Sequence, residues 1–260
     1  MNVAILCEGI SDAELLGQYM RNVNHYHLRE LHDAQSFDIV SYADTQHIKM
    51  YDNKHHHLAI WASHGIWGIP GMVSDIMEGN QLDSGAKRVD AVAIVIDHDS
   101  EEDVSDCLGR CAHAQEHLAT VDTCAMRGQW ICVPYQDSFS NQHNVFLTAI
   151  VLPEDTPGAI ESFIMQALSG HDDKNELLVK KVQTWLDALL EKTEELPDGY
   201  LRKPRDIVKA PLSVYLSVAS PNRMLERISD VLSTLDWTKF DLTQTTFLRL
   251  ADEWVGKNIK

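Results

Sequence analysis

The chain is poor in cysteine, in basic side chains and in long apolar runs, and each shortage excludes a class of protein. Its 260 residues include five cysteines, an odd number without a paired framework, which fits a reducing compartment better than a disulfide-stabilised secreted domain. No apolar stretch approaches the roughly 20 residues that a membrane-spanning helix needs. The first residues, MNVAILCE, lack the basic and long apolar regions of a secretory signal, so we expect a cytoplasmic protein without a membrane partner.

Basic residues are outnumbered, and they are unevenly distributed along the chain. There are 22 Lys and Arg against 39 Asp and Glu, which gives a formal net charge of −17. This balance argues against an exposed, unassisted nucleic-acid-binding surface, because phosphate contacts normally require clustered basic side chains. Residues 1–199 hold 12 basic against 32 acidic side chains, whereas residues 200–260 hold 10 against 7. Any polyphosphate contact should therefore involve the stretch from Arg202 to Lys209, unless that stretch is merely solvated.

Short apolar runs alternate with helical patterns in the first part of the chain, and helical patterns alone follow. Residues 3–7 and 91–96 are apolar runs typical of fully buried parallel strands. This order predicts an α/β fold, with a mainly parallel sheet flanked by helices and a helical carboxyl-terminal part. Further strands are expected at 37–42, 58–62, 130–134 and 145–152. Helices are expected at 12–22 with Ser11 as the N-cap, and at 104–119, 160–168, 176–192, 207–219, 224–235 and 243–255.

Two segments stand out from this alternation. The tract from His47 to Gly85 is rich in His, Trp and Gly, and its composition suggests an elaboration or insertion in the sheet domain. The segment from Glu194 to Pro204 contains Pro and Gly residues typical of a hinge or boundary. We therefore expect an α/β domain over residues 1–170 and a helical part over residues 171–260 that packs on it.

Two acidic clusters carry the chemistry that the sequence suggests. Glu8-Gly9-Ile10-Ser11-Asp12 follows the first predicted strand, and Asp97-His98-Asp99 follows the strand at 91–96. Open α/β sheets bind their ligands at the carboxyl ends of the strands. Gly9 should permit a tight turn between Glu8 and Asp12, and alternation should point Asp97 and Asp99 to one face of the sheet. Four carboxylates converging there would repel one another, so one or two Mg²⁺ or Mn²⁺ ions are the simplest explanation.

These clusters and two later motifs resemble one family. Glu8-Gly9-x-x-Asp12 after a first strand, with Asp97-x-Asp99 after a later one, resembles the TOPRIM fold of topoisomerases, bacterial primases, recombination-associated proteins and OLD-type (overcoming lysogenization defect) nucleases. Leu152-Pro153-Glu154-Asp155 with Gly158-x-x-Glu161 is similar to the strand-to-helix segment of OLD-type and small standalone TOPRIM-like proteins. Ile207-Val208-Lys209-Ala210 resembles their lysine-bearing helix. The motifs cover about 50 residues and leave the tract from His47 to Gly85 unexplained.

The resemblance implies a TOPRIM-like, Rossmannoid sheet with a nuclease-type site. It implies that Glu8, Asp97 and Asp99 bind one metal ion, and that Asp12 and Glu161 help to hold a second. Two such ions can activate a water and stabilise the leaving oxygen of a phosphodiester. Glu161 lies near the start of a predicted helix, however, where an acid can simply favour the helix dipole.

Lys209 and Glu8 receive catalytic roles from the same resemblance. Lys209, contributed by the helical part, would neutralise charge that develops on the phosphate. Glu8 could act as a general acid or base instead of a ligand. A lone lysine on an amphipathic helix usually points at water, so the role of Lys209 depends on the motif around it.

The function implied is metal-dependent hydrolysis of DNA or RNA, by an effector of a bacterial or phage-related defence system. The chain contains no Walker A pattern, so an ATPase of the kind that works beside OLD-type relatives would have to be a separate partner protein. We also expect a homo-oligomer. The alternative is a non-catalytic binding or regulatory module that holds a metal or nucleotide in the same site, since an acidic protein that docks on a basic partner would carry the same charge.

Other patterns leave two further possibilities open. Trp61 and Trp67 lie among glycines and could stack on bases, although core packing is the commoner role of such tryptophans. Cys107 with Cys111, and His113 with His117, stand at helical spacing. They could bind zinc together with Cys124 or Cys132, although the spacing matches no standard zinc module.

Overall fold

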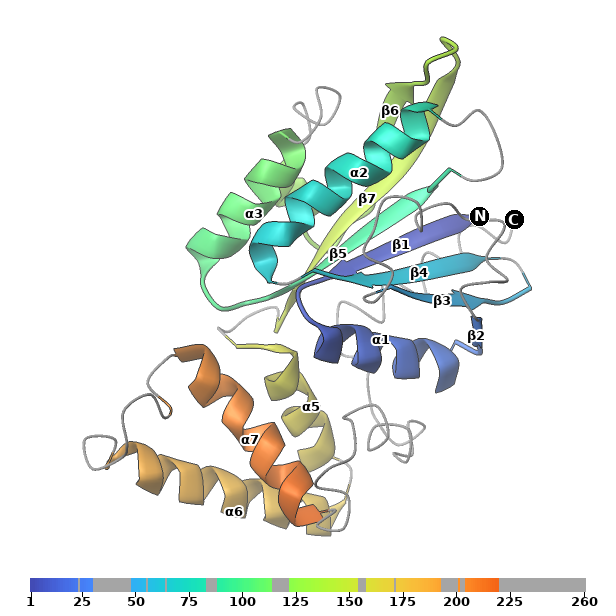
Figure 1. Ribbon diagram of the computed structural model, residues 1–260. Helices are drawn as coiled ribbons and strands as arrows, with labels where there is room; N and C mark the ends of the chain where they lie inside the picture. Colours follow the sequence, from blue (N-terminus) through green and yellow to red (C-terminus); the bar gives the residue numbers. More distant parts are fainter. Residues whose placement is uncertain are drawn as a thin grey trace.

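The computed structural model describes residues 1–22, 24–29, 48–54, 56–63, 65–82, 88–113, 122–153, 158–170, 172–192, 201 and 204–219. These residues form a seven-stranded sheet in the order β2-β3-β4-β1-β5-β7-β6, with helices on both faces (Figure 1). The strands are β1 (Asn2–Cys7), β2 (His27–Arg29), β3 (Ile48–Asp52), β4 (His57–Ala62), β5 (Ala91–Asp97), β6 (Ile131–Gln136) and β7 (Gln142–Leu152). The helices are α1 (Ile10–Asn22), the 3₁₀ turn η4 (Ile66–Gly68), α2 (Ile69–Leu82), α3 (Glu101–His113), α4 (Thr123–Met126), α5 (Ile160–Ser169), α6 (Asp173–Leu190) and α7 (Pro204–Ala219).

The centre of the sheet is parallel and apolar. β1 pairs in parallel with β4 on one side and with β5 on the other, so that Ile5 lies between Ile60 and Ala93. β5 pairs in parallel with β7. Strands buried on both faces need apolar side chains at every position, which is why continuous apolar runs encode them. The strands predicted within β1, β4, β5 and β7 are confirmed, and with them the α/β class with a mainly parallel sheet.

Side chains of β1 alternate between two cores. Val3, Ile5 and Cys7 belong to the core that also contains apolar side chains of α1, α5, α6 and α7. Ala4 and Leu6 belong to the opposite core, which contains apolar side chains of α2, α3 and α4. Because each face of the sheet is covered, the molecule has three layers (Figure 1).

The helices after the sheet form a group below the carboxyl ends of the central strands (Figure 1). α5, α6 and α7 contact one another. Ile164, Val182 and Leu212, one from each helix, are buried in the same core as α1. These helices confirm the helical part that the sequence predicts after the sheet, whereas the helices predicted at 224–235 and 243–255 lie outside the described residues.

The tract from His47 to Gly85 is part of the sheet and not an insertion. Its described residues supply β3, β4, η4 and α2, and β4 pairs with β1 at the centre of the sheet. The composition was misleading because several of its unusual residues are strand residues. Trp61 of β4, for example, is buried in the core that α2 covers.

The start of α1 also differs from the prediction. α1 begins at Ile10, so Ser11 lies inside the helix and is not its N-cap. The Gly9 N–H donates to Asp12 Oδ2 at 2.8 Å, so an acid in the third helical position takes the capping role. Gly9 is not among the described glycines with positive φ, which are Gly65 and Gly128, so the turn after β1 does not depend on left-handed backbone.

The sequence also predicts a helix at 104–119, a buried strand at 130–134 and a strand at 37–42. α3 begins at 101 instead of 104, because Ser100 Oγ accepts from the Asp103 N–H at 3.0 Å and donates to Asp103 Oδ2 at 2.7 Å. The helix end predicted at 119 lies outside the described residues. β6, expected to be buried, alternates between buried and exposed residues because it lies at the edge of the sheet. The strand predicted at 37–42 lies outside the described residues. Within the described part of the chain, no helix is long and apolar enough to cross a membrane.

Candidate functional site

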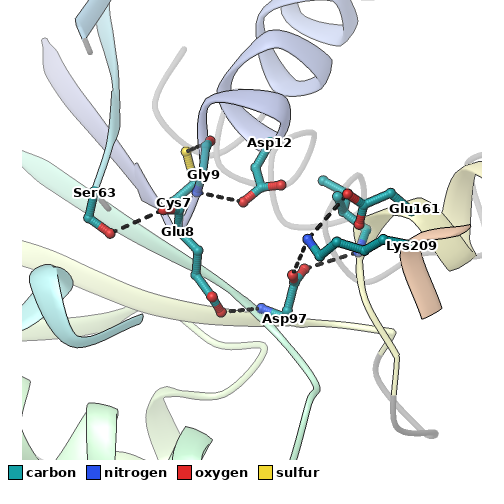
Figure 2. Close-up of polar contacts among 9 residues, drawn as sticks. Cys7, Glu8, Gly9, Asp12, Ser63, Asp97, Glu161 and Lys209 are labelled. Carbon is teal, nitrogen blue, oxygen red and sulfur yellow. Dashed lines mark hydrogen bonds and ion pairs between the residues drawn. The ribbon is translucent and has the colours of Figure 1, made fainter. Parts of the chain in front are cut away.

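Four carboxylates and one ammonium group meet beside the carboxyl ends of β1 and β5 (Figure 2). Glu8 follows β1, Asp97 ends β5, Asp12 lies in the first turn of α1 and Glu161 in the first turn of α5. Lys209 comes from α7. All four acids are buried, so their charges are removed from solvent and depend on one another.

Asp97 is the centre of this cluster. Its Oδ1 accepts from the Ile160 N–H at 3.0 Å, and its Oδ2 accepts from Lys209 Nζ at 3.2 Å. Its own N–H donates to Glu8 Oε1 at 2.9 Å. Asp97 therefore connects the first strand, the start of α5 and α7, three parts of the chain that are distant in sequence.

Lys209 bridges two acids, and one acid oxygen stays unpaired. Lys209 Nζ lies 3.2 Å from Glu161 Oε1 and 3.2 Å from Asp97 Oδ2. Glu161 Oε2 is buried and has no hydrogen-bond partner among the described residues. A buried oxygen without a partner loses the hydrogen bonds it would make to water, which is unfavourable. This atom is therefore ready to accept a donor or a cation.

Asp12 has an unusual affinity for its proton. Burial and, after it, the charges of Asp97 and Glu161 raise the pKa of Asp12 to about 7, although Lys209 and the hydrogen bond from Gly9 oppose them. The carboxyl group is thus partly protonated near neutral pH. A cation that replaced this proton would remove the repulsion that raises the pKa.

Cys7, the last residue of β1, is buried beside the carboxylates. Burial raises the pKa of the Cys7 thiol well above its usual value, and the charges of Asp12, Glu8 and Asp97 add to this effect. The thiol donates weakly to the carbonyl oxygens of Gly9 and Trp61, at 3.6 and 3.7 Å. Cys7 is therefore a protonated packing residue and not a nucleophile, because thiolate is the reactive form.

The turn after β4 supports Glu8, and the sequence did not indicate it. The Ser63 N–H donates to Cys7 O at 2.8 Å and the Gly65 N–H donates to Glu8 O at 2.9 Å. Ser63 Oγ donates to Gly65 O at 2.6 Å. Gly65 has a φ of 111°, which a residue with a side chain rarely adopts. The Ser-x-Gly after an apolar run was the available signal, but only the pairing of β4 with β1 gives it a meaning.

Gly158, the first residue of the Gly-x-x-Glu161 motif, is explained by packing. A Cβ on Gly158 would lie 2.9 Å from Pro153 Cδ, closer than such atoms approach. Glycine at 158 therefore lets the chain turn tightly into α5 and brings Glu161 to Asp97. Glu154 and Asp155 lie outside the described residues.

Asp99 differs from the expectation. The sequence predicts that Asp97 and Asp99 point to the same face, but β5 ends at Asp97 and the alternation of a strand does not continue beyond it. Asp99 lies in the following bend and is exposed, so it is outside the buried cluster. The other predicted site residues, Glu8, Asp12, Glu161 and Lys209, are brought together with Asp97 (Figure 2).

The donor set suits a hard cation, although the residues are not arranged as a finished metal site. Within the described residues, no three His, Cys, Asp or Glu side chains are grouped closely enough to hold a metal ion. The Lys209 ammonium instead lies between Asp97 and Glu161. Carboxylate oxygens are the ligands that Mg²⁺ and Mn²⁺ prefer, and the unpaired Glu161 Oε2 offers one of them. The residues therefore fit such an ion by their chemistry.

The cysteine and histidine pairs on α3 are part of the core or exposed. Cys107 and Cys111 are buried, and the hydrogen bond between the two thiols together with burial raises the pKa of the Cys111 thiol. His113 is exposed at the end of α3, and His117 lies outside the described residues. A zinc site here stays a prediction without support from the described part.

Comparison with known proteins shows the fold of the chain. No family model matches the chain, and no curated protein sequence matches it at a significant level. A crystal structure of a hypothetical protein from Pyrococcus horikoshii OT3 is similar, with a TM-score of 0.57 and 15% identity. The match covers 97% of this chain and 95% of that chain. At this identity the likeness shows a shared α/β fold alone.

Proposed function

We propose that this protein is a metal-dependent nuclease of TOPRIM type that hydrolyses phosphodiester bonds of DNA or RNA. The observation that carries the proposal is the meeting of Glu8, Asp12, Asp97 and Glu161 with Lys209, at the sheet edge where α/β proteins bind ligands. Buried acids gathered at such a cost in repulsion favour a catalytic or binding role over a structural one.

Asp97, Glu8 and Glu161 would hold the first ion, and Asp12 would share a second with Glu161. When bound, Mg²⁺ or Mn²⁺ supplies Lewis acidity, which activates water and stabilises a leaving oxygen. Lys209 would move from the carboxylates to a phosphate oxygen and neutralise charge that develops there. Glu8 or Asp12 would accept or donate a proton, and the pKa of Asp12 near 7 suits that task at neutral pH.

The proposal extends to the cellular setting. All five cysteines are free, which supports a reducing compartment such as the cytoplasm. The acidic composition supports control by a separate basic partner, for which an ATPase is our candidate in a defence system. We also propose a homo-oligomer, which would offer a second site to a second strand.

A nuclease assay with Mn²⁺ or Mg²⁺ tests the proposal. The purified chain should cut plasmid DNA or a long RNA, and a chelator should stop it. Asp97→Ala and Glu161→Ala should each lower the rate roughly 100-fold or more, the usual loss when a charge-stabilising group is removed. Asp106→Ala, an exposed acid on α3, is the matched control and should cut at the native rate. Equal rates in all variants would reject this site.

The position of Lys209 favours a second candidate function, a non-catalytic regulatory module. Because its ammonium already offsets part of the negative charge of Asp97 and Glu161, the cluster is partly stabilised without any metal ion. A regulatory module should bind Mn²⁺, seen as a rise in Tm, and yet cleave neither DNA nor RNA. A nuclease should bind Mn²⁺ and also cleave the nucleic acid.

A further inference from the structure

Trp67 is the exposed one of the two tryptophans that the sequence offered as stacking residues. Its side chain is 50% exposed, whereas Trp61 is buried in the core. Trp67 belongs to η4, which directly follows the carboxyl end of β4. The Gly65 N–H donates to Glu8 O, and two residues span at most about 7 Å. Trp67 is therefore held close to the carboxylate site.

The turn that carries Trp67 is fixed on both sides. Ser63 Oγ donates to Gly65 O at 2.6 Å, and a Cβ on Gly68 would lie 2.9 Å from the Ser63 Cβ. Cys107 Sγ of α3 donates to Ile66 O at 3.6 Å. Ile69, which follows η4 and begins α2, is completely buried. The indole is thus presented by a rigid support, and it contributes little to the core behind it.

Arg110 lies over the exposed indole. Its guanidinium carbon is 4.7 Å from the centre of the Trp67 ring, and the Arg110 side chain is itself exposed on α3. A guanidinium over an indole face offers a planar aromatic surface and a positive charge together. The exposed positive charge stands out on a chain with a net charge of −17, because acids occupy the first turn of the same helix.

We propose that Trp67 and Arg110 form a stacking site for an unpaired base of the nucleic acid whose phosphodiester reaches the carboxylates. The inference rests on the proposed function and names its substrate class: single-stranded, or locally unpaired, DNA or RNA. A base inside a duplex has both faces covered by its neighbours, so an exposed indole can stack only on a base that is unpaired or at an end. Sequence-tolerant stacking with one cation is typical of single-strand binding.

Binding measured apart from cleavage tests the inference. The full chain is titrated into fluorescein-labelled dT20, U20 and a 20-base-pair duplex, with Ca²⁺ in place of Mg²⁺, and fluorescence anisotropy gives Kd. Gel electrophoresis afterwards checks that the strands are intact. Trp67→Ala should weaken dT20 and U20 binding about five- to 150-fold, the usual loss of one stacked base. Arg110→Ala should weaken both to a smaller extent and leave the duplex affinity unchanged.

Three further variants separate stacking from folding. Trp67→Phe keeps an aromatic face and should bind dT20 within about threefold of the native chain, whereas Trp67→Leu, equally apolar but without that face, should resemble the alanine variant. Trp185→Ala removes a tryptophan of α6 that is 55% exposed and should not change the affinity. If Trp67→Ala lowers the Tm, the difference in dT20 affinity between the phenylalanine and leucine variants shows whether stacking or folding explains the loss of binding.

The outcomes distinguish this inference from the proposed function. Three results would overturn the stacking site. The native chain could fail to bind dT20, Trp67→Ala could bind it as tightly as the native chain, or the phenylalanine and leucine variants could bind it equally. If the native chain cleaves duplex DNA although the stacking site is rejected, the nuclease proposal stands without the stacking site. If instead Trp67-dependent binding occurs and no metal supports cleavage, the stacking site stands and the hydrolytic function fails.

Discussion

Two aspartates of nearly equal burial, at opposite ends of the sheet, have opposite affinities for protons. Asp12 beside the candidate site is 4% exposed, and Asp137 in the turn between β6 and β7 is 5% exposed. Burial and the charges of Asp97 and Glu161 raise the pKa of Asp12 to about 7. Burial also acts to raise the pKa of Asp137, but its hydrogen bonds hold that pKa well below the usual range.

The difference comes from the partners of each carboxylate. Asp137 accepts from the backbone N–H groups of Phe139 and Asn141, both at 2.9 Å, from the Asn141 side chain at 3.0 Å and from His143 Nε2 at 2.8 Å. Its charge is therefore used to close the hairpin. Asp12 accepts from the Gly9 N–H and faces other acids. A buried acid in a structural role is surrounded by donors, whereas acids gathered without enough donors indicate a site that awaits a cation.

The largest expected effect is on Asp12. Asp12→Asn should raise the free energy of unfolding of the metal-free protein by up to about 4 kcal/mol above pH 7, because each pKa unit between 3.8 and about 7 corresponds to about 1.4 kcal/mol. The asparagine Oδ1 can still accept from Gly9, so capping is retained. Urea unfolding in the presence of a chelator measures the difference.

The pH dependence of that difference has a definite sign. The folded protein holds the Asp12 proton more tightly than the unfolded chain, so its stability falls as the pH rises from about 4 through about 7. Asp12→Asn lacks this contribution. The two proteins should converge near pH 4 and differ most above pH 7. Parallel profiles would show that Asp12 is not held in a field of other acids.

The second effect is that of a metal ion. At a free Mn²⁺ concentration 100 times its Kd, the native chain should gain about 2.7 kcal/mol, or roughly 5–10 °C in Tm. At one fixed Mn²⁺ concentration the gain should be larger at pH 8 than at pH 6, because binding displaces the proton of Asp12 and the apparent Kd is therefore lower at pH 8. Differential scanning fluorimetry at both pH values measures it. The gain should be lost in Asp97→Ala and kept in Asp106→Ala, and a gain equal in both variants would place the ion elsewhere.

The smallest effect, and one of opposite sign, is expected at Asp137. Asp137→Asn should lower the Tm at pH 7, because the amide replaces a carboxylate oxygen that accepts from His143 and Asn141. Since the pKa of Asp137 is lowered by folding, the loss should shrink as the pH falls through the usual range of aspartate towards that lowered pKa, and should be smaller at pH 3 than at pH 7. Thermal unfolding at pH 3 and pH 7 checks this. A stabilised Asp137→Asn would remove the contrast between the two regions.

The central strands and the ends that carry acids were predictable from local pattern. The run Val3–Cys7 can only be a buried strand, and Glu8 must then emerge at its carboxyl end. Asp97 follows the same logic at the end of β5. Asp99 does not, because its place depends on where the strand stops pairing, which neighbouring strands decide.

Two features of the site required the tertiary structure. Ser63 and Gly65 support Glu8 only because β4 lies beside β1, which the tract between His47 and Gly85 did not reveal. The contact of Lys209 with Asp97 joins residues 112 positions apart. Local sequence patterns do not predict contacts between such distant residues, since these contacts form only when the chain folds.

By itself, the sequence determined which strands are buried and that acids follow two of them, because apolar runs and chain order act locally. Only the folded chain decided which acids share one site, which is left outside it and which cation lies between them. Burial and Coulomb interaction depend on distances in space, so the pKa of Asp12 and the unpaired oxygen of Glu161 exist only once α1, β5, α5 and α7 have met.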